Sequence, residues 1–372
     1  MGKSYYSLGL MSGTSMDGVD ASIIQSNGEE KYKEIIDKYY EYPKAIYKDL
    51  TVLRDKIKSS RDLKKFSKEI KNIEKEITLF HGKVAGQVLK KIKAKVDFIG
   101  FHGQTIYHNG KKKISKHIGS GKLLSLLTKK TVVYNFRKND LMNGGQGAPL
   151  TPIFHKLLKE KLKIKYASFV NIGGIINITN FGKKDHMSGY DLGPGMCLID
   201  KWIRLKLKKR YDKNGVVAKS GKVNNSILKK MMKIFYEKQE KLFKTKSYTI
   251  SYDVQNFDLN LIKNLSLEDG AATLIQFTTN ILSYSFKLSD RDEKEIILIG
   301  GGRKNKFLIE KLKEKNNRIK LIDEFGIDGD FIESQAFAYL AIRSYLKLPI
   351  SFPETTGVKK ACTGGIVKKI KL

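Results

Sequence analysis

A short stretch near the start of the chain combines glycines with small polar residues in a way that suits phosphate binding. It reads GLMSGTSMDGVD. Glycines let backbone N–H groups approach a phosphate closely, and hydroxyl groups can donate to its oxygens. The Walker pattern is absent, because no Lys follows the glycine and the chain leaves as a strand. The stretch therefore predicts either a phosphate-binding turn or an ordinary hairpin turn, made of Gly13, Thr14, Ser15, Met16, Asp17, Gly18, Val19 and Asp20.

Two further glycine turns lie in the second half of the chain. NIGGI contains Gly173 and Gly174 after an apolar strand, and IGGGRKN contains Gly301 and Gly302 between a strand and a helix. The first matches the turn at Gly13, and two such turns facing each other would clamp a nucleoside triphosphate. The second suits a phosphate near a helix start. Neither has the GxGxxG spacing of a dinucleotide fold, and each could equally be a structural turn.

Four charged residues could perform acid–base, metal or substrate chemistry. Asp191 in GYDLGPG lies at a strand end, where its carboxylate could accept a proton or cap the following helix. Arg137 could clamp a carboxylate or form an ordinary ion pair. Asp17 could bind Mg²⁺ through water or cap its own turn. Glu333, on the otherwise apolar IESQAFAYLA helix, is either a boundary residue or a ligand to a sugar hydroxyl.

The segment GFHGQTIYH, residues 100–108, predicts a polar loop at a strand end, with Thr105 among the groups that hydrogen-bond a substrate. A Ser/His/Asp hydrolase is disfavoured because the GxSxG elbow is missing. The two cysteines, Cys197 and Cys362, have no metal-type spacing and are expected to be structural thiols in a reducing cytoplasm.

Alternation of apolar strands and helical stretches predicts the elements that position these residues. An opening hairpin, two helices between residues 43 and 95, and strands at 96–103 and 131–136 fill the first half. The second half restarts with a strand–glycine–strand pattern at 166–181, which hints at a duplicated domain. Further helices are expected at 193–209, 224–241, 268–287 and after 305, with a strand at 295–302 and a last helix at IESQAFAYLAIRSYL.

The composition sets limits on the class of protein. A chain of 372 residues suggests two or three domains with ample core. The net charge of +33 raises nucleic acid or an anionic membrane as partners, but only nine of the 71 basic residues are Arg and the lysines are dispersed. A solvated lysine surface, with no specific nucleic-acid partner, is therefore expected. The sequence contains no stretch of about 18 uninterrupted apolar residues, so no membrane span is expected. No signal peptide is expected either.

Nine blocks in order resemble the anhydro-N-acetylmuramic acid kinase family along nearly the whole chain. They are GLMSGTSMDGVD, GFHGQTIYH, NFRKNDLMNGGQGAPLTP, NIGGIINIT, GYDLGPGMCLID, YDKNGVVAKSG, IGGGRKN, ESQAFAYLA and PETTGVKKACTGG. The resemblance implies an α/β fold of two related actin-like (ribonuclease H-like) domains with a central nucleotide cleft. It places an N-terminal domain at 1–138, completed by 346–372, and a C-terminal domain at 139–345.

The same resemblance implies an activity and roles for residues. The enzyme would use ATP, Mg²⁺ and water to open 1,6-anhydro-N-acetylmuramic acid and phosphorylate O6, in cell-wall recycling. Asp191 would be the general base, the turn at 13–20 and Gly173, Gly174, Gly301 and Gly302 would hold ATP, and Asp17 would lie near the metal. Thr105, Arg137 and Glu333 would hold the sugar. A cytoplasmic homodimer is expected, while residues 246–259 and the MCLID block depart from the family pattern.

Two alternatives remain at this point. One is a related kinase of the same fold that phosphorylates another sugar or acid. The other is a polyanion-binding protein with a decayed active site, which the net charge of +33 would favour. The presence of Asp17, Asp191 and Glu333 together argues against decay.

Overall fold

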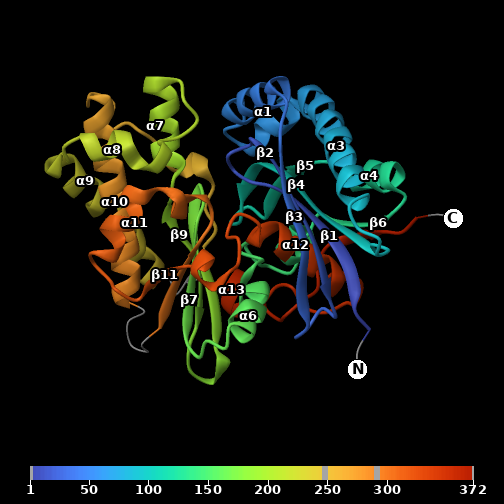
Figure 1. Cartoon of the computed structure of the whole chain (residues 1–372). Helices are drawn as coiled ribbons and strands as arrows, with labels where there is room; N and C mark the ends of the chain where they lie inside the picture. The colour runs from blue at the N-terminus through green and yellow to red at the C-terminus, as the bar shows by residue number, and fades with distance from the viewer. Residues whose placement is uncertain (1–2, 245–249, 289–293, 371–372) are drawn as a thin grey trace. The chain divides into compact units, whose positions relative to one another are not determined.

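The computed structural model describes residues 3–244, 250–288 and 294–370, and the chain divides into two units (Figure 1). Unit 1 consists of residues 1–161 and 330–372, and unit 2 of residues 162–329. The chain therefore leaves unit 1 once, completes unit 2, and returns.

Unit 1 is built on a seven-stranded sheet in the order β12-β6-β4-β1-β2-β3, with β5 paired to β4. The first three strands form an antiparallel meander, whereas β4 pairs in parallel with both β1 and β6. The bounds are β1 (Tyr5–Ser12), β2 (Gly18–Ser26), β3 (Tyr32–Glu41), β4 (Phe98–Asn109), β5 (Ile114–Ile118), β6 (Thr131–Tyr134) and β12 (Ile366–Lys368).

The helices of unit 1 include one from the far end of the sequence. They are α1 (Lys44–Lys56), α2 (Ser60–Lys65), α3 (Ser67–Leu89), α4 (Gly121–Thr128), α5 (Arg137–Met142), α6 (Pro152–Lys161), α12 (Ile332–Tyr345) and α13 (Pro353–Thr356). Helix α12, red in Figure 1, packs across β1, β2 and β4. Gly9 and Gly100 permit this approach, because a Cβ at either position would collide with the α12 backbone.

Unit 2 repeats the arrangement with five strands in the order β11-β10-β7-β8-β9. Its meander is β7 (Ala167–Ile172), β8 (Ile175–Phe181) and β9 (Met187–Pro194), and its parallel strands are β10 (Glu295–Ile299) and β11 (Ile319–Leu321). The helices are α7 (Cys197–Leu207), α8 (Val216–Ser220), α9 (Asn225–Lys244), α10 (Leu267–Leu288) and α11 (Lys306–Lys313), with short 3₁₀ turns η1 (Lys183–Asp185), η2 (Lys213–Gly215), η3 (Val254–Asn256), η5 (Gly301–Lys304) and η6 (Ile322–Phe325).

The two sheets share one topology. In each, the first strand is central, an antiparallel meander extends to one side, and two later strands join in parallel on the other. This strand order confirms the predicted pair of related actin-like α/β domains. Each unit also has its own apolar core: Leu8, Leu10 and Phe101 are buried in unit 1, and Val170 and Trp202 in unit 2.

The structure corrects the sequence-based expectations in two regions of unit 1. Three helices, rather than two, occupy the region after Pro43, because Ser59 and Asp62 form a capping box that starts the additional helix α2. The prediction of a polar loop at residues 100–108 was wrong. These residues lie within β4, which continues to Asn109 because β5 supplies an antiparallel partner for its second half.

The division into units also differs from the predicted boundaries at 138/139 and 345/346. Residues 139–161 and 330–345 lie in unit 1. The reason is that α12 packs on the unit 1 sheet. Helix α6 packs on α12 in turn, with the Phe154 ring of α6 5.7 Å from the Tyr339 ring of α12. Within the described part of the chain, no helix combines the length and apolar character needed to cross a bilayer.

Candidate active site

The turn between β1 and β2 exposes small polar side chains on a fixed backbone. Met16 adopts a left-handed conformation (φ 58°), donates its N–H to the Gly13 carbonyl at 3.2 Å, and buries its side chain in the core. Thr14 and Ser15 are exposed as a result, and the Ser15 hydroxyl donates to Asp17 Oδ1 at 2.5 Å. The turn thus presents two hydroxyl groups beside one carboxylate.

Not every residue predicted in this turn has its side chain available to a ligand. Val19 is fully buried, as is Met16, so these two can offer only backbone groups. Gly18 is required by packing, since a Cβ there would meet the Tyr40 carbonyl. Asp20 lies in β2, opposite Met11, and is half-buried.

A buried polar network supports the end of β1 and was not foreseen from the sequence. Ser12 Oγ lies 2.8 Å from Tyr42 Oη and 3.2 Å from His81 Nε2. His81 Nδ1 donates to the Ile77 carbonyl at 2.8 Å, so in the neutral ring Nε2 is the acceptor. Burial lowers the pKa of His81 to about 4 and keeps the ring neutral. The Tyr42 N–H donates to the Asp17 carbonyl at 2.8 Å, which ties this network to the turn.

In unit 2, hydrogen bonds from residues at the start of α7 fix the turn between β7 and β8. The Gly174 carbonyl accepts the N–H groups of Gly195 and Cys197 at 2.9 and 3.3 Å, and the Gly173 carbonyl accepts the Met196 N–H at 2.9 Å. The carbonyls of the turn are thereby fixed toward the helix.

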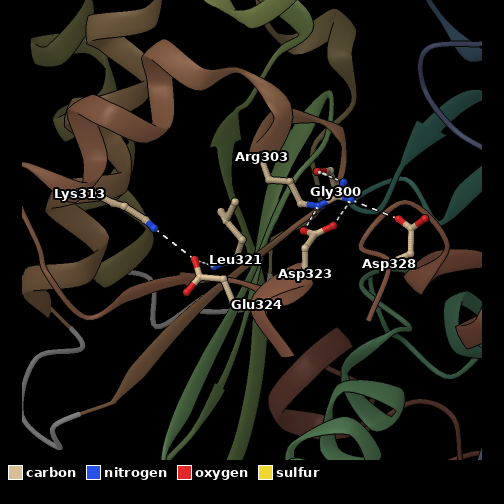
Figure 2. A network of polar contacts seen from close by, with 7 residues as sticks. All are labelled: Gly300, Arg303, Lys313, Leu321, Asp323, Glu324 and Asp328. Carbon is tan, nitrogen blue, oxygen red and sulfur yellow. Dashed lines mark hydrogen bonds and ion pairs between the residues drawn. The ribbon is translucent and has the colours of Figure 1, made fainter. Parts of the chain in front are cut away.

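The third turn, Gly300–Gly302, is held by the buried side chain of Arg303 (Figure 2). Its guanidinium donates to both Asp323 carboxylate oxygens at 2.7 and 2.8 Å, to Asp328 Oδ1 at 3.3 Å and to the Gly300 carbonyl at 3.1 Å. The Arg303 hydrogen bonds hold the pKa of Asp323 below its usual range. Arg303 stands in the motif itself, whereas Asp323 is 20 residues away and gave no sequence signal.

The glycines of these turns fall into two groups when a Cβ is placed on each. At Gly301 it would meet no atom within 4 Å, at Gly13 only the Ser15 hydroxyl at 3.9 Å, and at Gly173 only the Ile175 carbonyl at 3.5 Å. At Gly302 it would collide with Ile172, so that glycine serves packing. The space at the first three fits a bound group that lies against the backbone, as phosphates do at such turns.

Asp191 is held by hydrogen bonds from both its main chain and its side chain. It lies in β9 with only 7% of its surface exposed. Its Oδ2 accepts the Ser251 hydroxyl at 3.1 Å and the Tyr252 N–H at 2.8 Å, and its own N–H donates to the Ile250 carbonyl at 3.1 Å. Residues 250–252 belong to the segment that departs from the family pattern, whose residues 246–249 lie outside the described part of the chain.

Arg137 opens α5 and lies among neutral histidines in unit 1. Its Nη1 donates to the Gly147 carbonyl at 3.2 Å and its Nη2 to His102 Nε2 at 3.4 Å. Burial, reinforced by the Arg137 charge, lowers the pKa of His102 to about 3, so this ring is an acceptor. Thr105 is half-buried in β4 and pairs with His117 of β5, whose ring centroid lies 4.8 Å from that of His102. The backbone pairing of Thr105 with His117 thus places it next to the histidines that surround Arg137.

Glu333 is half-buried in the first turn of α12, where the helix dipole favours a negative charge. Its neighbours fasten the helix start: Ser334 Oγ lies 2.6 Å from Ser22 Oγ of β2, and Gln335 donates to Asp37 of β3 at 2.8 Å. Glu333, Thr105 and Arg137 therefore belong to unit 1, and Asp191 to unit 2.

No group of three or more His, Cys, Asp or Glu side chains within residues 3–244, 250–288 and 294–370 could hold a metal ion by itself. Mg²⁺ in phosphoryl-transfer enzymes needs only one or two carboxylates, because substrate phosphates and water complete its octahedron. Asp17, beside the exposed hydroxyls of the first turn, fits such a role.

The repeated actin-like units and their strand-end glycine turns define the class of actin-like ATPases and kinases. A model of the anhydro-N-acetylmuramic acid kinase family matches residues 5–369. Proteins named anhydro-N-acetylmuramic acid kinase from Pelagibacter ubique, Agrobacterium fabrum and Zymomonas mobilis are 51%, 35% and 36% identical to this chain, and each alignment covers at least 98% of both sequences. The chain belongs to the anhydro-N-acetylmuramic acid kinase family, and it is a phosphotransferase that acts on an alcohol group.

Among solved structures, component A of (R)-2-hydroxyglutaryl-CoA dehydratase from Acidaminococcus fermentans aligns over 92% of this chain and 100% of its own, with a TM-score of 0.44 and 11% identity. This likeness is too distant to bear on function.

Proposed function

We propose that this ATP-dependent kinase hydrolyses the 1,6-anhydro bridge of 1,6-anhydro-N-acetylmuramic acid and phosphorylates O6, giving N-acetylmuramic acid 6-phosphate and ADP. The observation that carries the proposal is the full-length match to relatives of that name, at 51% identity in the first case. A kinase of the same fold with another substrate is not favoured, because the match covers 99% of this chain and 100% of that relative.

Asp191 acts as the general base in this proposal. Its carboxylate takes a proton from water, the water oxygen attacks C1, the C1–O6 bond breaks, and O6 receives the γ-phosphoryl group of ATP. Relief of strain in the bicyclic sugar favours the ring opening. The hydrogen bonds from Ser251 and Tyr252 support this role, because they fix the carboxylate and favour its charged form.

In this proposal, ATP binds at the strand-end glycine turns. The phosphates approach the backbone at Gly13, Gly173 and Gly301, where a side chain would otherwise stand. Thr14 donates a hydroxyl hydrogen bond to a phosphate oxygen. The Ser15 hydroxyl donates to Asp17, and Asp17 would hold Mg²⁺ through water. When bound, the metal neutralises charge on the phosphate oxygens during transfer.

The sugar is held by unit 1 side chains. Arg137 faces the lactyl carboxylate, since a guanidinium fork pairs well with two carboxylate oxygens. Thr105 donates to a polar group of the sugar, and Glu333 accepts from a ring hydroxyl or from the attacking water. The neutral His102 ring supports this assignment, because it holds Arg137 without competing for its charge.

A cytoplasmic site of action is part of the proposal, because ATP is available there and both cysteines are free thiols. The product then enters amino-sugar catabolism as part of cell-wall recycling. The homodimer stays a prediction from family resemblance, to be checked by sedimentation.

The test is ADP release with Mg-ATP and 1,6-anhydro-N-acetylmuramic acid, compared with N-acetylmuramic acid and glucose. We expect turnover on the anhydro sugar alone, with one solvent oxygen incorporated at C1. Turnover on an ordinary sugar would contradict the coupled ring opening. Silence on all three sugars, with salt-sensitive polyanion binding, would favour a decayed site.

The Asp191→Asn variant tests the base. It keeps the side-chain shape but cannot accept the proton, so we expect kcat to fall by about a thousandfold or more. ATP binding, measured by calorimetry, should change little. Activity within about tenfold of wild type would remove Asp191 from the role of base.

A further inference from the structure

We propose that Ser251 is a positioning residue for catalysis, which orients the Asp191 carboxylate and sets its proton affinity from outside the sheet. The inference rests on the proposed role of Asp191 as general base. It begins from the sheet order, in which β9 is an edge strand. The outward-facing N–H of Asp191 donates to the Ile250 carbonyl at 3.1 Å, so residues 250–252 line that edge next to the carboxylate.

One side-chain donor and one main-chain donor of this segment meet the same Asp191 oxygen. The Ser251 hydroxyl and the Tyr252 N–H donate to Asp191 Oδ2 at 3.1 and 2.8 Å. Together with the backbone bond to Ile250, three hydrogen bonds from consecutive residues fix both the main chain and the side chain of Asp191. A carboxylate held in this way loses little rotational freedom when it must meet a water molecule.

The segment is anchored independently of Asp191, so it positions the aspartate rather than being positioned by it. Ile250 is buried, and the Tyr252 ring lies 5.4 Å from the Phe257 ring. Between Tyr252 and Phe257 in the sequence, the Asp253 carboxylate caps η3 by accepting the Gln255 N–H at 3.0 Å. The ammonium of Lys238 on α9 lies 5.5 Å from the centre of the Phe257 ring.

The Ser251 hydroxyl also affects protonation. A donor to a carboxylate stabilises the charged form, and its removal raises the pKa of that carboxyl group. Tyr252 is a titratable group that interacts electrostatically with Asp191. Burial raises the pKa of its phenol, so Tyr252 stays neutral at the pH values where a carboxylate base titrates.

The experiment compares Ser251→Ala with Ser251→Thr in the full-length enzyme, using ADP release with saturating Mg-ATP and the anhydro sugar. For Ser251→Ala we expect kcat to fall about tenfold and the acidic limb of the kcat/KM profile to move up by about one pH unit. The KM for ATP should not change. Ser251→Thr keeps the hydroxyl and should restore both the rate and the profile.

Ser283→Ala is the matched control. The Ser283 hydroxyl donates to the Thr279 carbonyl at 2.8 Å within α10, and it is not one of the two donors to Asp191 described above. Its profile should equal that of wild type. Melting temperatures of all variants separate lost activity from lost folding, and if Ser251→Ala unfolds, Ser251→Cys supplies a weaker donor in the same place.

The outcomes separate this inference from the proposed function. An inactive Asp191→Asn beside an unshifted, fully active Ser251→Ala overturns the positioning role and leaves the base in place. An active Asp191→Asn overturns both. A slow Ser251→Ala whose profile does not move, or whose rate Ser251→Thr fails to restore, also overturns the positioning role.

Discussion

Arg137 illustrates how a single side chain is fixed where we propose that it binds the carboxylate of the sugar. One guanidinium nitrogen donates to the Gly147 carbonyl and another to the neutral His102 ring. The guanidinium holds its N–H donors in one plane, a geometry that a lysine ammonium cannot reproduce.

We therefore expect Arg137→Lys to raise the KM for the anhydro sugar by about tenfold or more, because a point charge replaces the fork. The KM for ATP should stay within about twofold, and steady-state kinetics in both substrates measures the difference. An unchanged sugar KM would take Arg137 out of the sugar site.

The candidate residues themselves could be predicted because their types and motifs are local. Asp191 stood out before a Gly-Pro turn, and Arg137 before a glycine-rich loop. Their partners could not be predicted in the same way. Ser251 lies 60 residues from Asp191 and Asp323 lies 20 from Arg303, and only the fold brings these pairs together.

At the scale of elements, the glycine turns separate residues needed for packing from residues that leave room for a ligand. Gly301 and Gly302 are adjacent in the same 3₁₀ turn, yet a Cβ at Gly301 meets nothing within 4 Å while one at Gly302 would lie 2.8 Å from the Ile172 carbonyl oxygen. Adjacent substitutions can thus test the nucleotide site against the fold.

Gly301→Ala should keep its thermal stability and raise the KM for ATP by about tenfold, since the new methyl group occupies space proposed for the nucleotide. Gly302→Ala should lose about 1–3 kcal/mol of stability from overpacking. Melting curves and ATP kinetics on both variants give the answer. A Gly301→Ala enzyme with normal ATP kinetics would place the nucleotide elsewhere.

Strands and helices were predicted well where the apolar periodicity is continuous. They were predicted less well where pairing with a distant element determines the secondary structure. The first strand and glycine turn of each unit agreed with prediction. Residues 100–108 did not, because their polar side chains obscured a strand that β5 completes. That α12 belongs to unit 1 likewise depends on Gly9 and Gly100, which lie hundreds of residues away from it in the sequence.

For the molecule as a whole, the attachment of α12 to the meander should make unfolding depend on pH. Gln335 of α12 donates to Asp37 of β3, and burial, with a smaller contribution from Glu34, raises the pKa of Asp37 to about 7. The unfolded chain releases this proton near pH 4, whereas the folded chain keeps it. Stability contributed by Asp37 is therefore present at low pH and is lost as the pH rises toward 7.

Asp37→Asn cannot ionise and should remove this dependence. We expect the wild type to lose on the order of 2 kcal/mol relative to the variant between pH 5 and pH 8. Urea unfolding at the two pH values measures the change. Parallel behaviour of the two proteins would show that Asp37 does not carry a proton in the folded state at pH 5.

The return of the chain into unit 1 has a consequence for the order of events during synthesis. Residues 162–329 leave the ribosome as one uninterrupted stretch that holds every strand of the second sheet. The first sheet has been made by then except for β12, but its face at Gly9 and Gly100 stays uncovered until α12 is translated. The second unit can therefore finish folding before the first. A chain that ends before residue 330 would have one folded unit and one sheet whose apolar face is exposed.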